Sequence, residues 1–392
     1  MLKIKKKSLM CFILLLPIFQ PVYLEVMLAP LKIYQLLTLG CFTYATLHVF
    51  LKRKKISAMS FVLLFYAGTL VVSTILGNGY INNSVLYAAK ISLIVLLFQI
   101  YADDMGVLLK SLMIYSEICV YINLLTILIA PDGFFSRSNS AYGMTEEWFL
   151  GADNNFAMWL VPSLVIAWIY AEVFKTKKRS ILLTMVIILT ELVRGSATGF
   201  MGVLIFLILI FVPYIRIILT PFRSIILVFI AFVVIVLMGN MGFLEPIVEM
   251  LGKDMTFSGR VVIWENAIEA IKDKPILGYG ILENNEVVKY LGRVETATWL
   301  GATHCHCQFL QLVFQGGFIA AIFIVLVYIL VIKEGKQNWD IRLTRYGIYG
   351  VVVYTIMGIV EVVENPLMFM LFPLAYYIAK LREASNRLGD LE

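Results

Sequence analysis

Apolar stretches alternate with short polar segments along most of the chain. Twelve such blocks can be delimited, at 8–29, 33–51, 57–76, 85–101, 107–130, 154–173, 180–194, 197–215, 224–243, 308–332, 346–363 and 366–380. A helix that crosses a membrane needs about 20 apolar residues, whereas the strands of a membrane barrel alternate at every second residue, which these blocks do not. The pattern predicts an all-α, polytopic integral membrane protein with about 12 transmembrane helices.

Two polar segments between the blocks are long, one at 131–153 and one at about 244–307. Helices of a bundle are usually joined by about 2 to 8 residues, so a connection as long as the second one is expected to have structure and function of its own. Apolar residues recur within it at helical spacing and predict an amphipathic helix from Gly259 to Lys274, which Pro275 closes. We therefore divide the chain into helices 1–9 (1–243), a large structured loop (244–307), and helices 10–12 with a tail (308–392).

Composition agrees with this division. Hydrophobic residues make up 61% of the chain and charged residues 15%, against about 25% charged residues in a soluble domain. A water-soluble fold is therefore excluded, and the blocks leave no room for a separate soluble domain.

The basic residues set the expected orientation. They gather between alternate blocks, at 3–7, 52–55, 175–179 and 333–345. Lys and Arg mark cytoplasmic loops, and long translocated loops do not count toward this rule. The distribution predicts a multi-pass protein with both termini cytoplasmic and the 244–307 loop outside. It also favours membrane anchoring over nucleic-acid binding as the reason for the basic clusters.

Two histidines lie where the long loop meets the tenth block. A neutral imidazole at His304 or His306 could accept a proton from a sugar hydroxyl, and the alternative is an interfacial polar pair without a chemical role. The four-residue run HCHC at 304–307 also suggests a metal site, but four consecutive side chains cannot converge on one tetrahedral ion. We therefore expect no metal, and no cofactor-binding motif is present.

Two arginines lie at the expected outer side. The guanidinium groups of Arg194 and Arg260 could each hold the phosphate of a lipid. The alternative for Arg194 is a residue at a helix end that reaches the headgroups or pairs with Glu191, and for Arg260 a solvated helix start. The sequence assigns no role to three further charges in or near apolar blocks, which are Lys90, Glu117 and Glu361.

Three motifs, in this order, resemble the O-antigen ligase and polymerase family, which contains the Wzy-type repeat-unit polymerases and the WaaL-type ligases. ELVRGSATG at 191–199 is similar to the family's Arg-Gly element at a hairpin tip. SGRVVIWENAIEAIKDKPILGYG at 258–280 resembles its Arg, Trp, then Pro-x-x-Gly-x-Gly pattern, and HCQFLQLVFQGG at 306–317 its His-Asn-x-x-Leu segment. The chain departs from the family at Cys307, which replaces the usual Asn, so no orienting hydrogen bond from that side chain can be assumed.

The resemblance implies an inverting glycosyl transfer at the outer face of the bacterial cytoplasmic membrane. The donor would be a glycan linked to undecaprenyl diphosphate, with a second glycan as acceptor and a chain-length regulator as a further partner. By motif matching, Arg194 and Arg260 would bind the lipid diphosphate. The catalytic residues would be His306, which acts as the base, and Arg260. Further residues expected to line the sugar groove are Trp264, Tyr279, Glu283, Trp299 and His304.

Several functions fit this pattern. A polymerase extends a chain of repeat units, whereas a ligase moves the glycan to a lipid A core, and we favour the polymerase because the chain is short. A repeat-unit transporter or flippase would have the same topology, but carriers place their key polar groups near the membrane midplane rather than in an outer loop. A structural or sensing membrane protein is a third reading, in which neither Arg260 nor His306 would affect glycan output.

Overall fold

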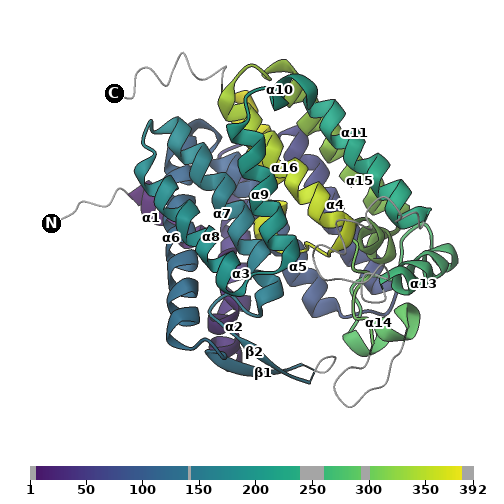
Figure 1. The fold of residues 1–392 in the computed structure, drawn as a ribbon. Coiled ribbons are helices and arrows are strands. Elements are labelled where there is room, and N and C mark those ends of the chain that lie inside the picture. Colours follow the sequence, from purple (N-terminus) through teal and green to yellow (C-terminus); the bar gives the residue numbers. More distant parts are fainter. Residues whose placement is uncertain (1–5, 140–142, 239–259, 293–300, 382–392) are drawn as a thin grey trace.

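The computed structural model describes residues 6–139, 143–238, 260–292 and 301–381, and this part of the chain is mostly helical (Figure 1). Its first half contains α1 (Lys6–Leu15), α2 (Val22–Leu28), η1 (Ala29–Leu31), α3 (Ile33–Leu51), α4 (Ala58–Leu76), α5 (Ile81–Ile100), η2 (Ala102–Asp104), α6 (Met105–Ile129), β1 (Phe135–Asn139), β2 (Gly143–Glu147) and α7 (Asp153–Val173). Its second half contains α8 (Lys178–Arg194), α9 (Ala197–Phe211), α10 (Ile215–Ile218), α11 (Pro221–Phe232), the π-helical η3 (Val233–Leu237), α13 (Arg260–Asp273), α14 (Asn284–Leu291), α15 (Gln308–Gln337), α16 (Arg342–Val360), α17 (Pro366–Phe369) and α18 (Leu371–Lys380).

Seven of the described helical stretches are long and apolar enough to cross a membrane. They are α3, α4, α5, η2 with α6, α7, α15 and α16. Shorter helices lie in the other predicted blocks, so the count of about 12 spans stays a prediction. The predicted tight hairpin is present, because only Gly195 and Ser196 separate α8 from α9.

The first predicted block is not a single helix. The helix α1 ends at Leu15, and α2 begins only at Val22 after the N-cap residue Pro21. Two prolines lie in this stretch, Pro17 and Pro21, and proline cannot donate the backbone hydrogen bond that a continuous helix needs. The prediction of one helix over 8–29 was therefore wrong.

A short β-hairpin forms in the first polar segment and departs from the predicted all-α class. Strands β1 and β2 pair antiparallel, with Phe135 opposite Glu147. The Arg137 guanidinium donates to the buried Glu147 carboxylate at 3.0 Å, which ties one strand to the other. Tyr23 packs against Phe134 and Phe135, so the hairpin rests on the start of α2.

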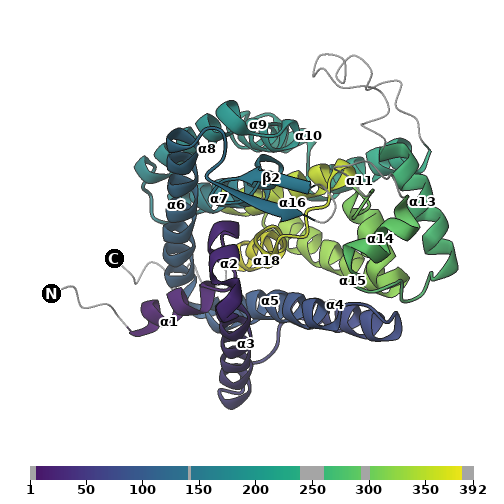
Figure 2. The same ribbon diagram turned by 90° about the horizontal axis from the view of Figure 1, so that it is seen from below.

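The helices form one bundle around α7 and α18. Both are buried along most of their length, and α18 packs against α16, α15 and α5 in the middle of the view from below (Figure 2). The helix α3 lies at the edge and packs mainly against α5. At one end of the bundle lie α13, α14 and the start of α15 (Figure 1).

Two of the three sequence motifs meet at a break in α15. Gly317 has φ 61° and ψ −168°, so the helical hydrogen bonds are interrupted there. The freed carbonyls of Phe314 and Gln315 accept the N–H groups of Tyr279 and Gly280, both at 2.8 Å. The chain after α13 is thereby attached to α15, which fixes the position of α13 and of the residue that begins it.

The same segment also reaches α4. The Ile281 N–H donates to the Thr74 hydroxyl at 2.9 Å, and the Ile281 carbonyl accepts from the Tyr80 N–H at 2.7 Å. Gly280 has φ +76°, and a Cβ there would overlap the Thr74 backbone. A glycine is thus required both by the conformation and by the close approach of two backbones.

Candidate functional site

Four polar side chains from three separate elements meet at this end of the bundle. Arg260 is the first residue of α13, His304 and His306 lie in the turn before α15, and Glu361 directly follows α16. Between 20% and 29% of each side chain is exposed, so the group can be reached from outside. We call these four residues the Arg-His-Glu cluster.

Glu361 is the centre of the cluster. Its Oε2 accepts a hydrogen bond from Arg260 Nη2 at 3.1 Å, and Arg260 Nη1 donates to the Val360 carbonyl at 2.6 Å. Its Oε1 lies 3.6 Å from His304 Nε2 and 3.6 Å from His306 Nδ1. The two imidazole rings are 4.0 Å apart, so one carboxylate faces a cation on one side and two histidines on the other.

The backbone of the histidine turn is held in an unusual conformation. His306 has a backbone φ of 47°, which residues other than glycine rarely adopt. The Trp264 indole N–H donates to the His306 carbonyl at 3.4 Å, and the Gln311 side chain accepts the N–H of Cys305 at 2.9 Å. Such conformations gather at functional sites when neighbouring structure holds them in place.

The environment adjusts the pKa values of the acid and the base in different ways. Burial lowers the pKa of His306 below its usual value, and the Glu361 carboxylate opposes this effect. Burial alone would raise the pKa of Glu361, but the neighbouring His304 and His306 and the charge of Arg260 outweigh it, so the pKa is lowered. The carboxylate is therefore ionised, and the imidazole of His306 is neutral, near pH 7.

The cluster also contains a set of groups that could hold a metal ion. His304, His306 and Glu361 each offer one ligand atom, and these atoms lie within 4.8 Å of one another. The Arg260 guanidinium already lies against the same carboxylate, and its positive charge opposes a dication there. Cys305 and Cys307 are fully buried, and burial raises the pKa of Cys307 to about 12, so neither is a thiolate ligand. The absence of a metal stays a prediction.

Arg194 lies at the tip of the α8–α9 hairpin and uses other partners. It donates from Nη2 to the Pro131 carbonyl at 2.8 Å, and its guanidinium lies 4.8 Å above the Trp148 ring. The predicted alternative, a pair with Glu191, is not formed, because the buried Glu191 carboxylate points toward Gly195 and Gly199 instead. Within the described residues, no hydrogen bond or ion pair joins Arg194 to the cluster.

The residues predicted to line a sugar groove differ in their placement. Trp264 and Tyr279 are buried, and the Tyr279 hydroxyl donates to the Ala270 carbonyl at 3.1 Å, so neither ring presents a face to a sugar in this arrangement. Glu283 is exposed at the start of α14, and His304 belongs to the cluster. Trp299 lies outside the described residues.

Partners are now visible for the three charges that the sequence left without a role. Lys90 donates to the Gln20 side chain at 2.6 Å, and Arg179 donates from Nε to Glu117 at 2.8 Å. Glu361 is the one that joins the cluster. The sequence offered only one sign of this, a carboxylate at the end of an apolar block, and such a position does not reveal its partners.

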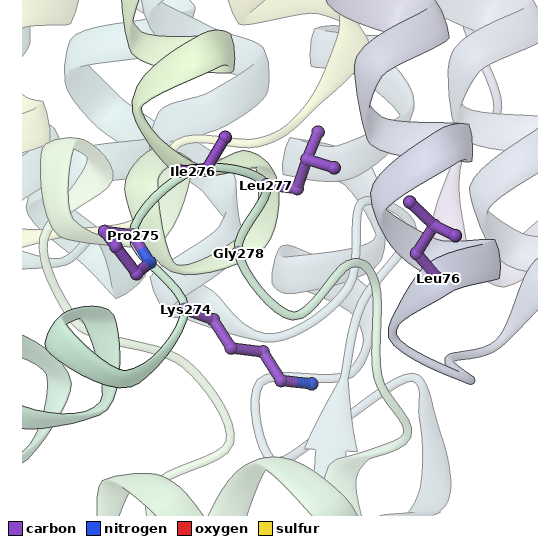
Figure 3. A pocket seen from close by; sticks show the side chains of 6 residues that line it. All are labelled: Leu76, Lys274, Pro275, Ile276, Leu277 and Gly278. Atoms are coloured by element: carbon purple, nitrogen blue, oxygen red, sulfur yellow. The ribbon is translucent and has the colours of Figure 1, made fainter.

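A shallow depression of about 300 Å³ lies beside the cluster's supporting segment rather than at the cluster. It is lined by the end of α4 and by residues 274–278, with Lys274 as its charged member (Figure 3). The Lys274 ammonium lies 4.6 Å from the Tyr279 ring. The depression therefore adds no residue to the Arg-His-Glu cluster.

A model of a known family matches part of the chain. Residues 179–325 match the family model described as O-antigen ligase, which confirms the predicted relationship to the O-antigen ligase and polymerase family. The matched part runs from α8 into α15 and includes Arg194, Arg260 and His306. Searches among curated proteins and solved structures found no match. The family relationship and the apolar helices indicate a multi-pass membrane protein with glycosyltransferase-like activity on lipid-linked glycans.

Proposed function

We propose that the protein is a membrane glycosyltransferase that polymerises oligosaccharide repeat units linked to undecaprenyl diphosphate. The product would be a capsular or O-antigen polysaccharide made at the outer face of the cytoplasmic membrane. The observation that carries the proposal is the Arg-His-Glu cluster, which brings the Arg of one family motif and the His of another to the same carboxylate.

The cluster fits an inverting transfer. A hydroxyl of the acceptor sugar attacks the anomeric carbon of the donor, its proton passes to the neutral His306, and the carbon–oxygen bond to the diphosphate breaks. The electron pair leaves with the diphosphate, whose negative charge needs positive partners at that moment. The lipid diphosphate is itself a good leaving group, so no nucleotide or cofactor is required.

Arg260 is suited to that second task. A guanidinium has five N–H donors, and its bonds to Val360 and Glu361 use two of them. The remaining donors can hold phosphate oxygens while the first two keep the group in place. We place Arg194 as a second contact to the lipid diphosphate, because its guanidinium is only partly covered by Trp148 and Pro131.

The direct test is His306→Ala in a host that lacks its own copy of the enzyme. We expect polymer to disappear while single repeat units are still exported and remain lipid-linked, as measured by glycan gels and by mass spectrometry of the lipid fraction. His48→Ala is the matched control, because His48 lies in α3 and faces Tyr44 rather than the cluster. Normal chain lengths in the His306 variant would refute the catalytic assignment.

An O-antigen ligase is the second candidate, and the description of the matching family favours it. Both enzymes would use the same donor and the same cluster, and they differ only in the acceptor. Purified protein supplied with lipid-linked repeat units alone, or with repeat units and a lipid A core, distinguishes them. Product of increasing length in the first mixture supports the polymerase, and transfer only in the second supports the ligase.

A repeat-unit transporter belongs to a different class. Its key polar groups would be expected halfway along the helices, whereas the Arg-His-Glu cluster lies at helix ends. A transporter also predicts that His306→Ala blocks export of the repeat unit, which the same lipid analysis would detect.

A further inference from the structure

We infer that Glu361 is the positioning residue of this site. Its Oε1 orients the His306 ring through Nδ1, which leaves Nε2 of His306 as the base, and its Oε2 holds Arg260. The inference rests on the proposed glycosyl transfer and deepens it, since it assigns a role to a residue outside both the family motifs and the matched segment.

The first argument is that each carboxylate oxygen has its own partners. Oε2 accepts from Arg260 at 3.1 Å, while Oε1 accepts the Val362 N–H at 3.2 Å and faces the two histidines. The Val362 bond comes from the same turn of backbone and fixes the direction of the carboxylate. Glu361 therefore sets the spacing between the base and the diphosphate-binding cation with a single group.

The second argument concerns the nitrogen that points inward. His306 Nδ1 is buried and has no hydrogen-bond partner among the described residues, and Glu361 Oε1 lies 3.6 Å from it. A buried polar atom without a partner is costly, and catalytic hydrogen bonds that are long in a free enzyme commonly shorten when substrate binds. A contraction of less than 1 Å gives an Nδ1–H···Oε1 bond.

The third argument is that the rest of the turn limits rotation of the ring. The His306 backbone is held at φ 47° by contacts to Trp264 and by the anchored Cys305 N–H. The side chain at 307, which supplies an amide in the family motif, is here a buried cysteine. Cysteine has no amide with which to orient the ring, and the carboxylate of Glu361 is placed to do so.

The chemistry follows from this arrangement. When Nε2 accepts the proton of the acceptor hydroxyl, His306 becomes an imidazolium, and the ionised Glu361 beside Nδ1 stabilises that charge. The carboxylate itself does not take up the proton. Its lowered pKa agrees with this role, since the neighbouring histidines and the charge of Arg260 outweigh the effect of burial.

His304 is part of the same arrangement. Its Nε2 lies as close to Glu361 Oε1 as His306 Nδ1 does, so the two rings compete for one oxygen. In a His304→Ala variant, His306 would be the one imidazole of the cluster that faces this oxygen.

The test uses the purified full chain in lipid vesicles with a lipid-linked repeat unit as substrate. We expect Glu361→Gln to lower kcat on the order of 100-fold, because the ring loses its orienting and charge-balancing partner. Glu361→Asp keeps the charge but withdraws it by one methylene, and should lower kcat about 10-fold. Glu364→Gln is the matched control from the same turn. Burial raises the pKa of Glu364 to about 7, although a hydrogen bond from Gln315 opposes this, so an amide imitates its protonated form.

Two readouts separate positioning from a structural effect. The carboxylate raises the pKa of His306, whereas His304 and Arg260 lower it, so Glu361→Gln should move the acidic limb of the pH–rate profile to lower pH. In addition, Glu361→Gln should cause a smaller loss when it is added to His306→Ala than when it is made alone, because only its contact with Arg260 then remains to be lost. Thermal unfolding of each variant shows whether it is folded.

The outcomes are distinguishable. If His306→Ala retains its rate, the proposed function fails and this inference with it. If His306→Ala is inactive but Glu361→Gln and Glu361→Asp keep the normal rate and pH profile, only the role of Glu361 is overturned. Activation of the wild-type chain by added Zn²⁺, with loss on chelation, would instead assign His304, His306 and Glu361 to a metal.

Discussion

Arg260 connects two elements whose contacting residues are 101 positions apart in the chain. Its two terminal nitrogens contact different acceptors, the Val360 carbonyl and the Glu361 carboxylate. A lysine ammonium is a compact point charge and cannot bridge both acceptors while presenting further donors to a ligand. At this position Arg and Lys are therefore not equivalent.

Arg260→Lys should reduce transfer by about 100-fold or more, because the leaving diphosphate loses part of a preorganised set of donors. The rate is measured with purified protein and lipid-linked substrate. Arg345→Lys is the control, since Arg345 likewise donates to two acceptors, the carbonyls of Trp339 and Asp340, but at the other end of α16. Equal losses in the two variants would mean that the effect is structural.

The pH dependence of the rate should reflect the environment of His306. Burial lowers the pKa of this imidazole, so it stays neutral, and able to accept a proton, to lower pH than an ordinary histidine. We expect the acidic limb of kcat/KM to lie below the usual histidine value of about 6.5. A limb above that value, measured in vesicles equilibrated on both sides, would contradict the assignment of His306 as the base.

The sequence identified part of the cluster and missed the rest for physical reasons. Arg260 and His306 stand in motifs that can be read locally. Glu361 became visible only once α13, the turn before α15 and the end of α16 had packed together. Trp264 was expected at a sugar groove, but its side of α13 faces inward, and its indole N–H supports the His306 backbone.

At the scale of elements, the apolar blocks predicted most helices because length and hydrophobicity are local properties. The amphipathic helix expected at 259–274 corresponds to α13. The β-hairpin was missed because its strands are short and largely polar, so they carry little of the apolar alternation that marks a strand. The interruption of the first block was also missed, although Pro17 and Pro21 could have indicated it.

The segment that follows α13 offers a test of how the site is supported. Gly280→Ala places a Cβ at φ +76° against the Thr74 backbone, so we expect a lower Tm in detergent and a strong loss of transfer. Gly68→Ala is the control, because Gly68 lies within α4 with no atom near its missing Cβ and should be neutral or slightly stabilising. Unchanged stability and rate in the Gly280 variant would show that the attachment of this segment to α4 is not required.

At the scale of the whole molecule, the proposed orientation makes a labelling prediction. The β-hairpin precedes α7, and Lys175 follows it. Because α7 has 21 residues, its two ends are about 30 Å apart. In intact cells a membrane-impermeant maleimide should label Glu286→Cys on α14, and should label Lys175→Cys only after permeabilisation.

The background for this experiment is low, because all five native cysteines are buried. Labelling of Lys175→Cys in intact cells, with none at Glu286→Cys, would reverse the orientation and place the cluster in the cytosol.

The basic loops predicted the side of each segment, whereas the packing of the bundle needed contacts between helices far apart in the chain, which hydrophobicity alone does not specify.

The residues of the cluster are synthesised in the order of their positions in the chain. Arg260 and the two histidines are synthesised first, and Glu361 emerges only after α15 and α16 have been made. A nascent chain that stops between 307 and 361 would contain Arg260 and the two histidines without the carboxylate that joins them. Such a product could insert into the lipid and still be inert, so translation has to pass α16 before the enzyme can work.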